Sequence, residues 1–222
     1  MIWSKDDRKG GGRAYHHGNL REALVRAALD LILKKGPAGF TFAEAARSAG
    51  VSPAAPYRHF RDRDELIADI ALRGFNLFET DLVRAWDEGN PNPSSALENV
   101  GRAYLEFARR EPAYYSAMFE AAIPLDSNPE LRNAGDRVFA VLRAASEKLI
   151  ATLPQRSRPP ALMVGLHVWA LSHGIASLFG RGDAARRPLP MTAEDLLEAG
   201  VLIYREGLGL GSRLPPDRSD TQ

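Results

Sequence analysis

The side chains best suited to binding chemistry lie in one short stretch near the N-terminus. Ser52 and Tyr57 carry hydroxyl groups that can donate hydrogen bonds to phosphate oxygens. Arg58 and His59 follow directly and add nitrogen donors and positive charge. Ala54 is small enough to let the backbone approach base edges or thymine methyl groups. The types and spacing of these residues therefore indicate contact with DNA.

Each of these side chains also has a plain structural alternative. Tyr57 could pack its ring inward, while Arg58 and His59 could be ordinary surface residues. Arg47, on the preceding expected helix, could meet a phosphate or pair with a carboxylate. Phe60 is expected in the core, because an aromatic ring at the end of a short helix holds that helix against its neighbours.

Sequence motifs of catalysis and of metal binding are missing. The chain has no glycine-rich phosphate loop, no Gly-x-Ser-x-Gly elbow, no His-Glu-x-x-His motif and no cysteine. His167 and His173 are six residues apart, whereas two metal ligands on one helix are usually about three or four apart. We therefore expect no catalytic residue, no metal site and no cofactor, and we expect both histidines to be core or interface residues.

Two short helices around a glycine turn would position the DNA-contacting residues. Thr41 and Glu44 have the spacing of a capping box that opens the first helix, which ends before a glycine. Ser52 is expected to cap the next helix, with Pro53 at its first position. Pro56 has no amide hydrogen, so the first turn of that helix should be irregular. The arrangement predicts a helix-turn-helix.

The remaining pattern is helical as well. Helices are expected at about 19–35, from the Asp62 cap toward Trp86, from Ser95 to before Pro112, from Tyr114 to Phe119, from Pro129 to Leu153, from Ala161 to Gly180 and from Thr192 to Leu208. No segment of useful length alternates with period two, so the sequence predicts an all-α fold of about nine helices. The expected organisation is a flexible basic arm at 1–17, a DNA-binding domain at 18–78, a larger helical effector-binding and dimerisation domain at 79–212, and a disordered tail at 213–222.

Composition and charge agree with a globular protein that has a basic N-terminal part. The chain has 222 residues, 45% hydrophobic and 26% charged, and a formal net charge of +1. Residues 1–75 contain thirteen Lys and Arg against nine Asp and Glu, as in a nucleic-acid reader with a separate partner domain. Residues 159–180 are uncharged and long enough to span a bilayer, but their prolines, histidines and glycines favour a buried helix. The N-terminus lacks the apolar run of a secretory signal, so a cytoplasmic location is expected.

The stretch from Phe40 to Phe60 closely resembles the DNA-binding signature of the TetR family of bacterial transcriptional regulators. The resemblance extends over about residues 19–70. It covers the alanine-rich helix, the Gly-Val-Ser turn and the Tyr-Arg-His-Phe sequence that ends at Phe60. Pro56 stands where the family more often has leucine. The resemblance therefore does not fix the tilt of the second helix of the expected helix-turn-helix. It implies a dimer that binds a palindromic operator, with DNA contacts at Thr41, Ser52, Ala54, Tyr57 and His59, to which the residue chemistry adds Arg47 and Arg58.

A second resemblance lies in the C-terminal part. The stretch from Trp169 to Gly174 looks like the tryptophan, histidine and glycine signature of one TetR C-terminal domain type. This implies a homodimer in which the last two helices of each subunit form a four-helix bundle. The helix expected at 161–180 agrees independently, because apolar residues on several of its faces need both a core and a partner to cover them.

Several aromatic and apolar side chains of this part could line an effector cavity or could be ordinary core. The candidates are Tyr114, Tyr115, Met118, Phe119, Met163, Trp169 and His173. The resemblance implies a repressor that an unidentified small molecule releases from its operator. Two other hypotheses are open at this point: a helical carrier of apolar small molecules and a protein-interaction module, neither of which binds DNA.

Overall fold

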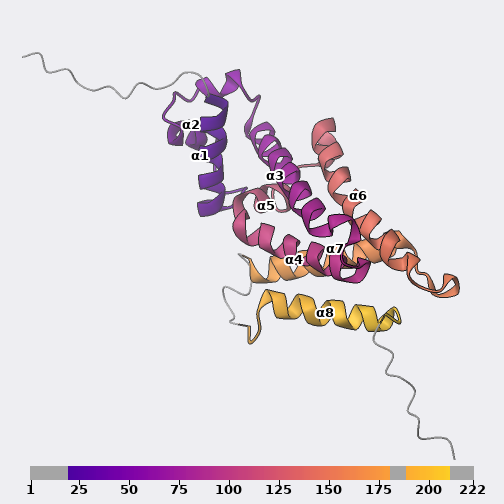
Figure 1. The fold of residues 1–222 in the computed structure, drawn as a ribbon. Helices are drawn as coiled ribbons and strands as arrows, with labels where there is room; N and C mark the ends of the chain where they lie inside the picture. Colours follow the sequence, from indigo (N-terminus) through magenta and orange to yellow (C-terminus); the bar gives the residue numbers. More distant parts are fainter. Residues whose placement is uncertain (1–19, 181–188, 211–222) are drawn as a thin grey trace, which may run out of the picture.

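The computed structural model describes residues 20–180 and 189–210, and every regular element in these ranges is a helix (Figure 1). The elements are α1 (Leu20–Lys35), α2 (Phe42–Ser48), η1 (Ala55–Arg58), α3 (Arg63–Trp86), η2 (Asp87–Gly89), α4 (Pro93–Arg110), α5 (Pro112–Phe119), η3 (Leu125–Ser127), α6 (Pro129–Ala151), η4 (Gln155–Ser157), α7 (Ala161–Phe179) and α8 (Ala193–Gly207), where η marks a short 3₁₀ segment. The all-α fold expected from the sequence is confirmed. The arm expected at 1–17 and the tail expected at 213–222 lie outside the described residues.

The long helix α3 connects the N-terminal helices to the rest of the molecule (Figure 1). A carboxylate oxygen of Asp62 caps it by accepting the N–H of Glu65 at 2.9 Å. Its 24 residues give a length of about 36 Å. Along this length it packs against α4, α5 and α6. One continuous helix therefore belongs to both parts of the fold.

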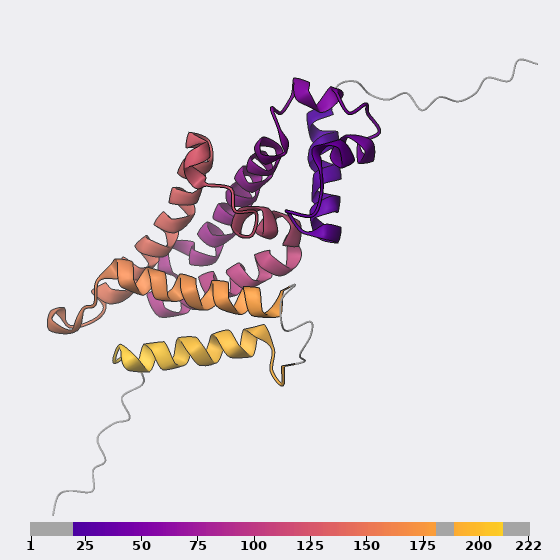
Figure 2. The same cartoon turned by 180° about the vertical axis from the view of Figure 1, so that it is seen from behind.

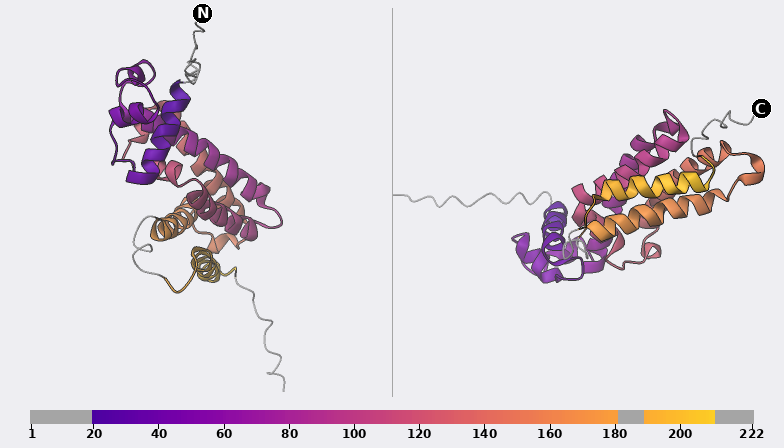
Figure 3. Two further views of the ribbon diagram at one scale, coloured as in Figure 1. Left: turned by 90° about the vertical axis from the view of Figure 1, so that its left-hand side faces the viewer. Right: turned by 90° about the horizontal axis from the view of Figure 1, so that it is seen from below.

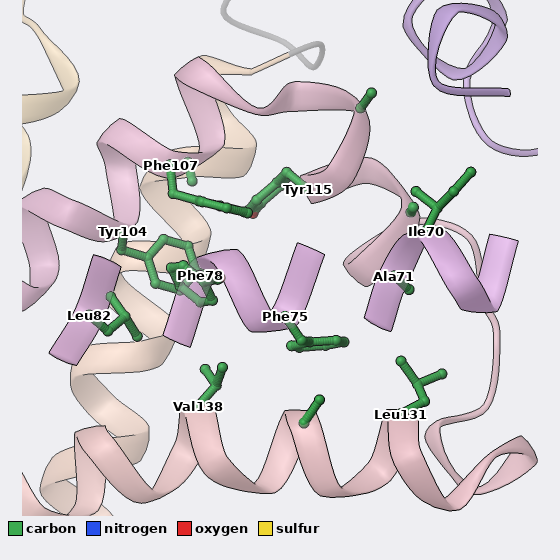
Figure 4. Close-up of a cluster of buried hydrophobic side chains, with 14 of the residues drawn as sticks. Ile70, Ala71, Phe75, Phe78, Leu82, Tyr104, Phe107, Tyr115, Leu131 and Val138 are labelled. Carbon is green, nitrogen blue, oxygen red and sulfur yellow. The ribbon is translucent and has the colours of Figure 1, made fainter. Parts of the chain in front are cut away.

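The main core lies where α3 meets α4 and α6 (Figure 4). The ring of Phe78 lies 4.9 Å from that of Tyr104 and 4.8 Å from that of Phe107, measured between centroids. Leu131 and Val138 of α6 face this cluster from the opposite side of α3 and are fully buried. Burial of each such large apolar side chain stabilises the fold by about 1.5–3 kcal/mol.

The short helix α5 approaches α3 closely at Gly74. A Cβ atom on this residue would lie 2.6 Å from the sulfur of Met118 and 3.2 Å from Cβ of Tyr114. The missing side chain of Gly74 therefore makes room for both residues on the surface of α3. Because α5 also packs against α1, this contact places α5 between the N-terminal helices and the larger part.

Helices α7 and α8 lie side by side on the part of the molecule away from α1 and α2 (Figures 2 and 3). Within the described ranges, α7 is the one helix long and apolar enough to cross a membrane, and 33% of its apolar window is buried. An interior helix of a globular protein meets the same criteria. The packing of α7 against α4, α6 and α8 accounts for its composition.

Most helix starts follow local capping signals. The capping box predicted at Thr41 is formed, and Thr192 forms a second one with Asp195. The helix expected to start at Ser95 begins earlier, at Pro93, because Asn92 is its cap. The side-chain oxygen of Asn92 accepts the N–H of Ser95 at 2.9 Å.

The element expected as the third helix is the four-residue 3₁₀ segment η1. The cap expected from Ser52 is absent, and Ala54 precedes the segment without a side-chain cap. Pro56 explains the difference, because it has no N–H to donate to the carbonyl of Ser52. Its own carbonyl accepts the N–H groups of His59 and Phe60 at 2.9 and 3.0 Å. The chain therefore makes one tight turn before it leaves for α3.

Candidate nucleic-acid interface and ligand cavity

A Schellman turn separates α2 from η1. The N–H of Val51 donates to the carbonyl of Ala46 and that of Gly50 to the carbonyl of Arg47, both at 3.0 Å. Gly50 has φ 74°, a left-handed conformation that glycine adopts without a Cβ clash. Gly50 therefore fixes the angle at which the chain leaves α2 for η1.

Two side chains anchor η1 in the interior and leave the others outside. Pro56 is buried and Phe60 is 2% exposed, with the guanidinium of Arg21 4.9 Å from the centre of the Phe60 ring. Tyr57 is 63% exposed. Its ring meets that of Phe42 edge-on, with the centroids 5.1 Å apart. The alternative in which Tyr57 packs inward is thereby excluded.

All seven residues predicted to contact DNA are at the surface of α2, of its N-cap, of the turn or of η1. They are Thr41, Arg47, Ser52, Ala54, Tyr57, Arg58 and His59. The contact between α2 and η1 brings them into one region of the molecule. The hydroxyl of Thr41 is engaged in the cap of α2, where it accepts the N–H of Glu44 at 3.2 Å.

Two arginines and a histidine of this region have no described counterion. Within the described ranges, the side chains of Arg47, Arg58 and His59 form no hydrogen bond or salt bridge. Lys35, by contrast, pairs with Glu44 at 2.7 Å. Hydrogen bonds from Lys35 and from the capping backbone lower the pKa of Glu44 to about 2. Exposed cations without a counterion are suited to phosphate oxygens.

Charged side chains fasten α1 to α3 behind this surface. Arg73 donates to the two carboxylate oxygens of Glu22 at 2.7 and 2.6 Å and to Asp69 at 2.9 Å. Arg21 donates to the other oxygen of Asp69 at 2.6 Å. The hydrogen bonds from Arg73 lower the pKa of Glu22. Sequence reasoning missed this network, because its partners are 48 and 51 residues apart.

Four of the seven residues predicted to line an effector cavity meet in an aromatic cluster. They are Tyr115, Phe119, Trp169 and His173. The hydroxyls of Tyr104 and Tyr115 lie 2.9 and 3.0 Å from Nδ1 of His173. Burial lowers the pKa of His173 and raises that of Tyr115 to about 12. The lowered pKa favours the neutral imidazole, in which Nδ1 can accept a hydrogen bond.

The other three candidates lie elsewhere. Tyr114 and Met118 pack against α3, and Met163 is exposed on α7. The second predicted histidine, His167, has its Nδ1 3.2 Å from the hydroxyl of Tyr204. The two histidines of α7 therefore face different partners.

Tyr115 also borders a cavity of about 260 Å³, which we call the α5 cavity. The cavity lies between α4, α5, α7 and the start of α8, and its walls include Leu105, Arg109, Tyr115, Glu120, Ala176 and Phe179. Arg109 at its edge pairs with Glu194 at 2.9 Å. Apolar walls with a few polar groups are typical of sites for small organic molecules.

Helices α7 and α8 carry large apolar side chains that no described residue covers, and we call these residues the α7/α8 face. They are Leu162, Met163, Leu166 and Leu178 on α7 and Leu202 and Ile203 on α8. Ile203 is the most exposed of them, at 73%. A gathering of exposed apolar side chains on two adjacent helices indicates an interaction surface.

Comparison with known families matches both parts of the chain. Residues 24–70 match the family model of bacterial regulatory proteins of the tetR family. Residues 97–203 match the model of a tetracyclin repressor-like C-terminal domain. The narrower tryptophan, histidine and glycine type stays a prediction. The uncharacterised HTH-type transcriptional regulator YobS of Bacillus subtilis (strain 168) is 23% identical over 199 residues, which are 88% of this chain and 96% of YobS.

Solved structures share the fold over most of the chain. A protein of unknown function from Rhodococcus sp. RHA1 is 27% identical with a TM-score of 0.72, over 88% of this chain and 98% of that one. AibR in complex with isovaleryl coenzyme A and operator DNA is 17% identical with a TM-score of 0.64, over 83% of this chain and 97% of AibR. The helix-turn-helix geometry, the two matching family models and these relatives agree: this chain belongs to the TetR family of bacterial transcriptional regulators.

Proposed function

We propose that this regulator is a repressor that binds a palindromic operator as a homodimer and is released from it by a small molecule. The observation that carries the DNA contact is the outward position of Tyr57, Arg58 and His59 on η1 while Pro56 and Phe60 face the core. The proposed contact set is the one expected from the sequence, with Thr41, Arg47, Ser52 and Ala54 completing it. The proposed DNA-binding domain is 18–78, and the effector-binding and dimerisation domain is 79–212.

The test is a fluorescence-anisotropy titration of the full chain against duplex DNA from the region upstream of its own gene, at several salt concentrations. We expect the logarithm of affinity to fall linearly with the logarithm of salt concentration. Replacing Arg58 or Arg47 with alanine removes a phosphate contact, so it should weaken binding to all sequences and flatten the salt dependence by about one unit of slope per subunit contact.

A matched control separates this effect from a general loss of positive charge. Arg156 is an exposed arginine of η4, at the end of α6 away from α1 and α2 (Figure 1). Arg156→Ala should bind DNA as the unchanged protein does. If Arg47→Ala and Arg58→Ala bind with unchanged affinity and salt slope, the assignment fails, and absence of any DNA binding favours a carrier or a protein-interaction module.

The dimer is proposed to form through the α7/α8 face. A second copy of the same face would bury its exposed apolar side chains in a four-helix arrangement with the first. A two-fold dimer also presents two copies of η1 to two half-sites one turn of DNA apart. We place the protein in the cytoplasm, where the chromosome of a bacterium is accessible.

The effector is proposed to bind in the α5 cavity, which Tyr115 borders. α5 contributes to the cavity wall and packs against α1 and α3. A ligand that displaces α5 would therefore act directly on the helices that hold the DNA-binding surface. AibR supports a shared arrangement, because its structure is a complex with both isovaleryl coenzyme A and operator DNA.

A further inference from the structure

A second cavity lies between α4, α7 and α8, separate from the α5 cavity, and we call it the α8 cavity. Its volume is about 220 Å³, room for roughly seven nonhydrogen atoms if each takes the volume of a water molecule. Leu97, Leu149, Val168, Leu171, Leu197 and Val201 provide most of its wall. These side chains are all apolar, so the cavity favours a hydrocarbon group.

The polar side chains of the wall are His167 of α7 and Tyr204 of α8, whose Nδ1 and hydroxyl lie 3.2 Å apart, and two more at one end of the cavity. Ser94 of α4 and Arg205 of α8 both line it. The ion pairs Arg102–Glu198 and Arg109–Glu194 show that α4 and α8 run antiparallel, because the residue numbers rise on one helix as they fall on the other. The start of α4 therefore lies beside the end of α8, and Ser94 and Arg205 are at the same end.

Both of these polar side chains have a buried atom without a partner. Among the described residues, three buried side-chain polar atoms lack a hydrogen bond: Oγ of Ser94, Oγ of Ser172 and Nε of Arg205. Two belong to the cavity wall. The third is beside it, since a Cβ on Gly101 of the wall would lie 3.5 Å from Oγ of Ser172. Buried polar atoms are nearly always paired in folded proteins, so the unpaired Oγ of Ser94 and Nε of Arg205 at one end of the cavity indicate a missing partner.

The charge of the cavity selects the kind of partner. Arg205 carries the one permanent formal charge among the described residues that line it, and no described Asp or Glu does so. A guanidinium Nε–H and a serine hydroxyl can both donate to one carboxylate. Gly101 lies seven residues along α4 from Ser94, a distance of about 10 Å, so the cavity extends away from this polar end.

We propose that the α8 cavity binds a small aliphatic monocarboxylate, with its carboxylate at Arg205 and Ser94 and its hydrocarbon chain between α4, α7 and α8. Hexanoate is the probe, because its chain and head group together fit the volume. This proposal does not depend on the effector role proposed for the α5 cavity. A measurement of ligand binding alone tests it.

The experiment is isothermal titration of the full chain with hexanoate and with 1-hexanol, which has the same chain without the charge. We expect hexanoate to bind at least about tenfold more tightly than 1-hexanol, since hydrogen bonds to a charged group are the stronger kind. Hexanoate should also raise the thermal midpoint, and the rise should grow with the logarithm of its concentration above the dissociation constant. Equal affinities for the two probes, or no binding of hexanoate at millimolar concentration, would overturn the proposal.

Variants locate the bound carboxylate. Arg205→Met keeps the aliphatic stem and should lose about tenfold in affinity for hexanoate without a change for 1-hexanol. Val201→Phe fills the cavity and should abolish binding of both probes. Arg143→Met is the matched control, because it removes an exposed arginine of α6 that lines neither cavity and should leave both affinities unchanged.

Two results of this series would refute the site. Unchanged hexanoate binding in Arg205→Met and Val201→Phe would place the ligand elsewhere, and a loss in Arg143→Met equal to that in Arg205→Met would make the effect one of net charge. If Arg205→Met does not fold, Ser94→Ala tests the same end of the cavity and should weaken hexanoate but not 1-hexanol.

Discussion

His173 is the residue on which two buried tyrosines depend. Its Nδ1 is within hydrogen-bond distance of the hydroxyls of Tyr104 and Tyr115, and Tyr104 is 1% exposed. The same ring packs against Phe119, so the imidazole serves as both a hydrogen-bond acceptor and a core aromatic group. Its identity as histidine therefore follows from its neighbours.

Replacing His173 with phenylalanine keeps the ring and removes the acceptor. The two tyrosine hydroxyls would then have only each other as hydrogen-bond partners. We therefore expect the free energy of unfolding to fall by about 1–3 kcal/mol. Urea denaturation followed by circular dichroism measures this change. Adding Tyr115→Phe to His173→Phe removes one stranded hydroxyl and should recover part of the loss. An unfolding free energy equal to that of the unchanged protein would show that these hydrogen bonds contribute nothing to stability.

The lowered pKa of His173 also predicts a pH dependence of stability. Burial disfavours the charged form in the folded state, whereas the unfolded chain takes up a proton near pH 6.5. The unfolded state thus binds more protons as pH falls below about 6.5, and stability should decrease from there toward the folded pKa. The decrease between about pH 6.5 and 5 should be smaller in His173→Phe. Identical pH profiles for the two proteins in that window would contradict the assignment.

At the scale of elements, α7 and α8 have two apolar sides. The inner side of α7 packs against α4 and α6, and the α7/α8 face is exposed in the single chain. A helix that only supported its own core would need one apolar stripe. The second stripe is the feature that a dimer explains.

Leu166→Glu places a charge in the α7/α8 face and should convert the dimer into a monomer, because a partner would have to bury the carboxylate. Light scattering coupled to size-exclusion chromatography should give a mass near 24.3 kDa for the variant and twice that for the unchanged protein. Leu125→Glu is the control, since Leu125 is similarly exposed but lies on η3. A dimeric Leu166→Glu would exclude this face as the interface.

Local signals predicted some elements well and others poorly. The capping boxes at Thr41 and Thr192 could be read from residues three apart, because the cap is formed within one turn. The start of α4 was displaced, since Asn92 competes with Ser95 for the same role. At η1 the predicted turn is present, but a 3₁₀ segment follows it in place of the expected helix, because Pro56 has no N–H to donate.

At the scale of the whole molecule, the exposure of the seven proposed DNA contacts was predictable and the cavities were not. The DNA-contacting residues follow one another along the chain, so their exposure depends mainly on local turns. Whether Tyr114 or Tyr115 borders a cavity depends on helices far along the sequence. Tyr114 packs where Gly74 leaves room on α3, and Tyr115 faces α4 and α7. Neither Gly74 nor His173 is marked as their partner by spacing.

One further prediction concerns how the oligomeric state changes the salt dependence of DNA binding. A dimer neutralises phosphates at two half-sites, whereas a monomer does so at one. The slope of the logarithm of affinity against the logarithm of salt concentration should therefore be about half as steep for Leu166→Glu as for the unchanged protein. Anisotropy titration with the same operator duplex measures both slopes. Equal slopes would mean that one subunit makes all the DNA contacts.

Two prolines next to the proposed DNA contacts of η1 lower the conformational entropy that is lost on binding DNA. Pro53 and Pro56 restrict the backbone around η1 before any partner is present. Little conformational entropy is then left to lose when the segment is immobilised against a duplex. The same stiffness limits how far the segment can adjust to a distorted groove, so tolerance of altered operator spacing must come from rotation of whole subunits.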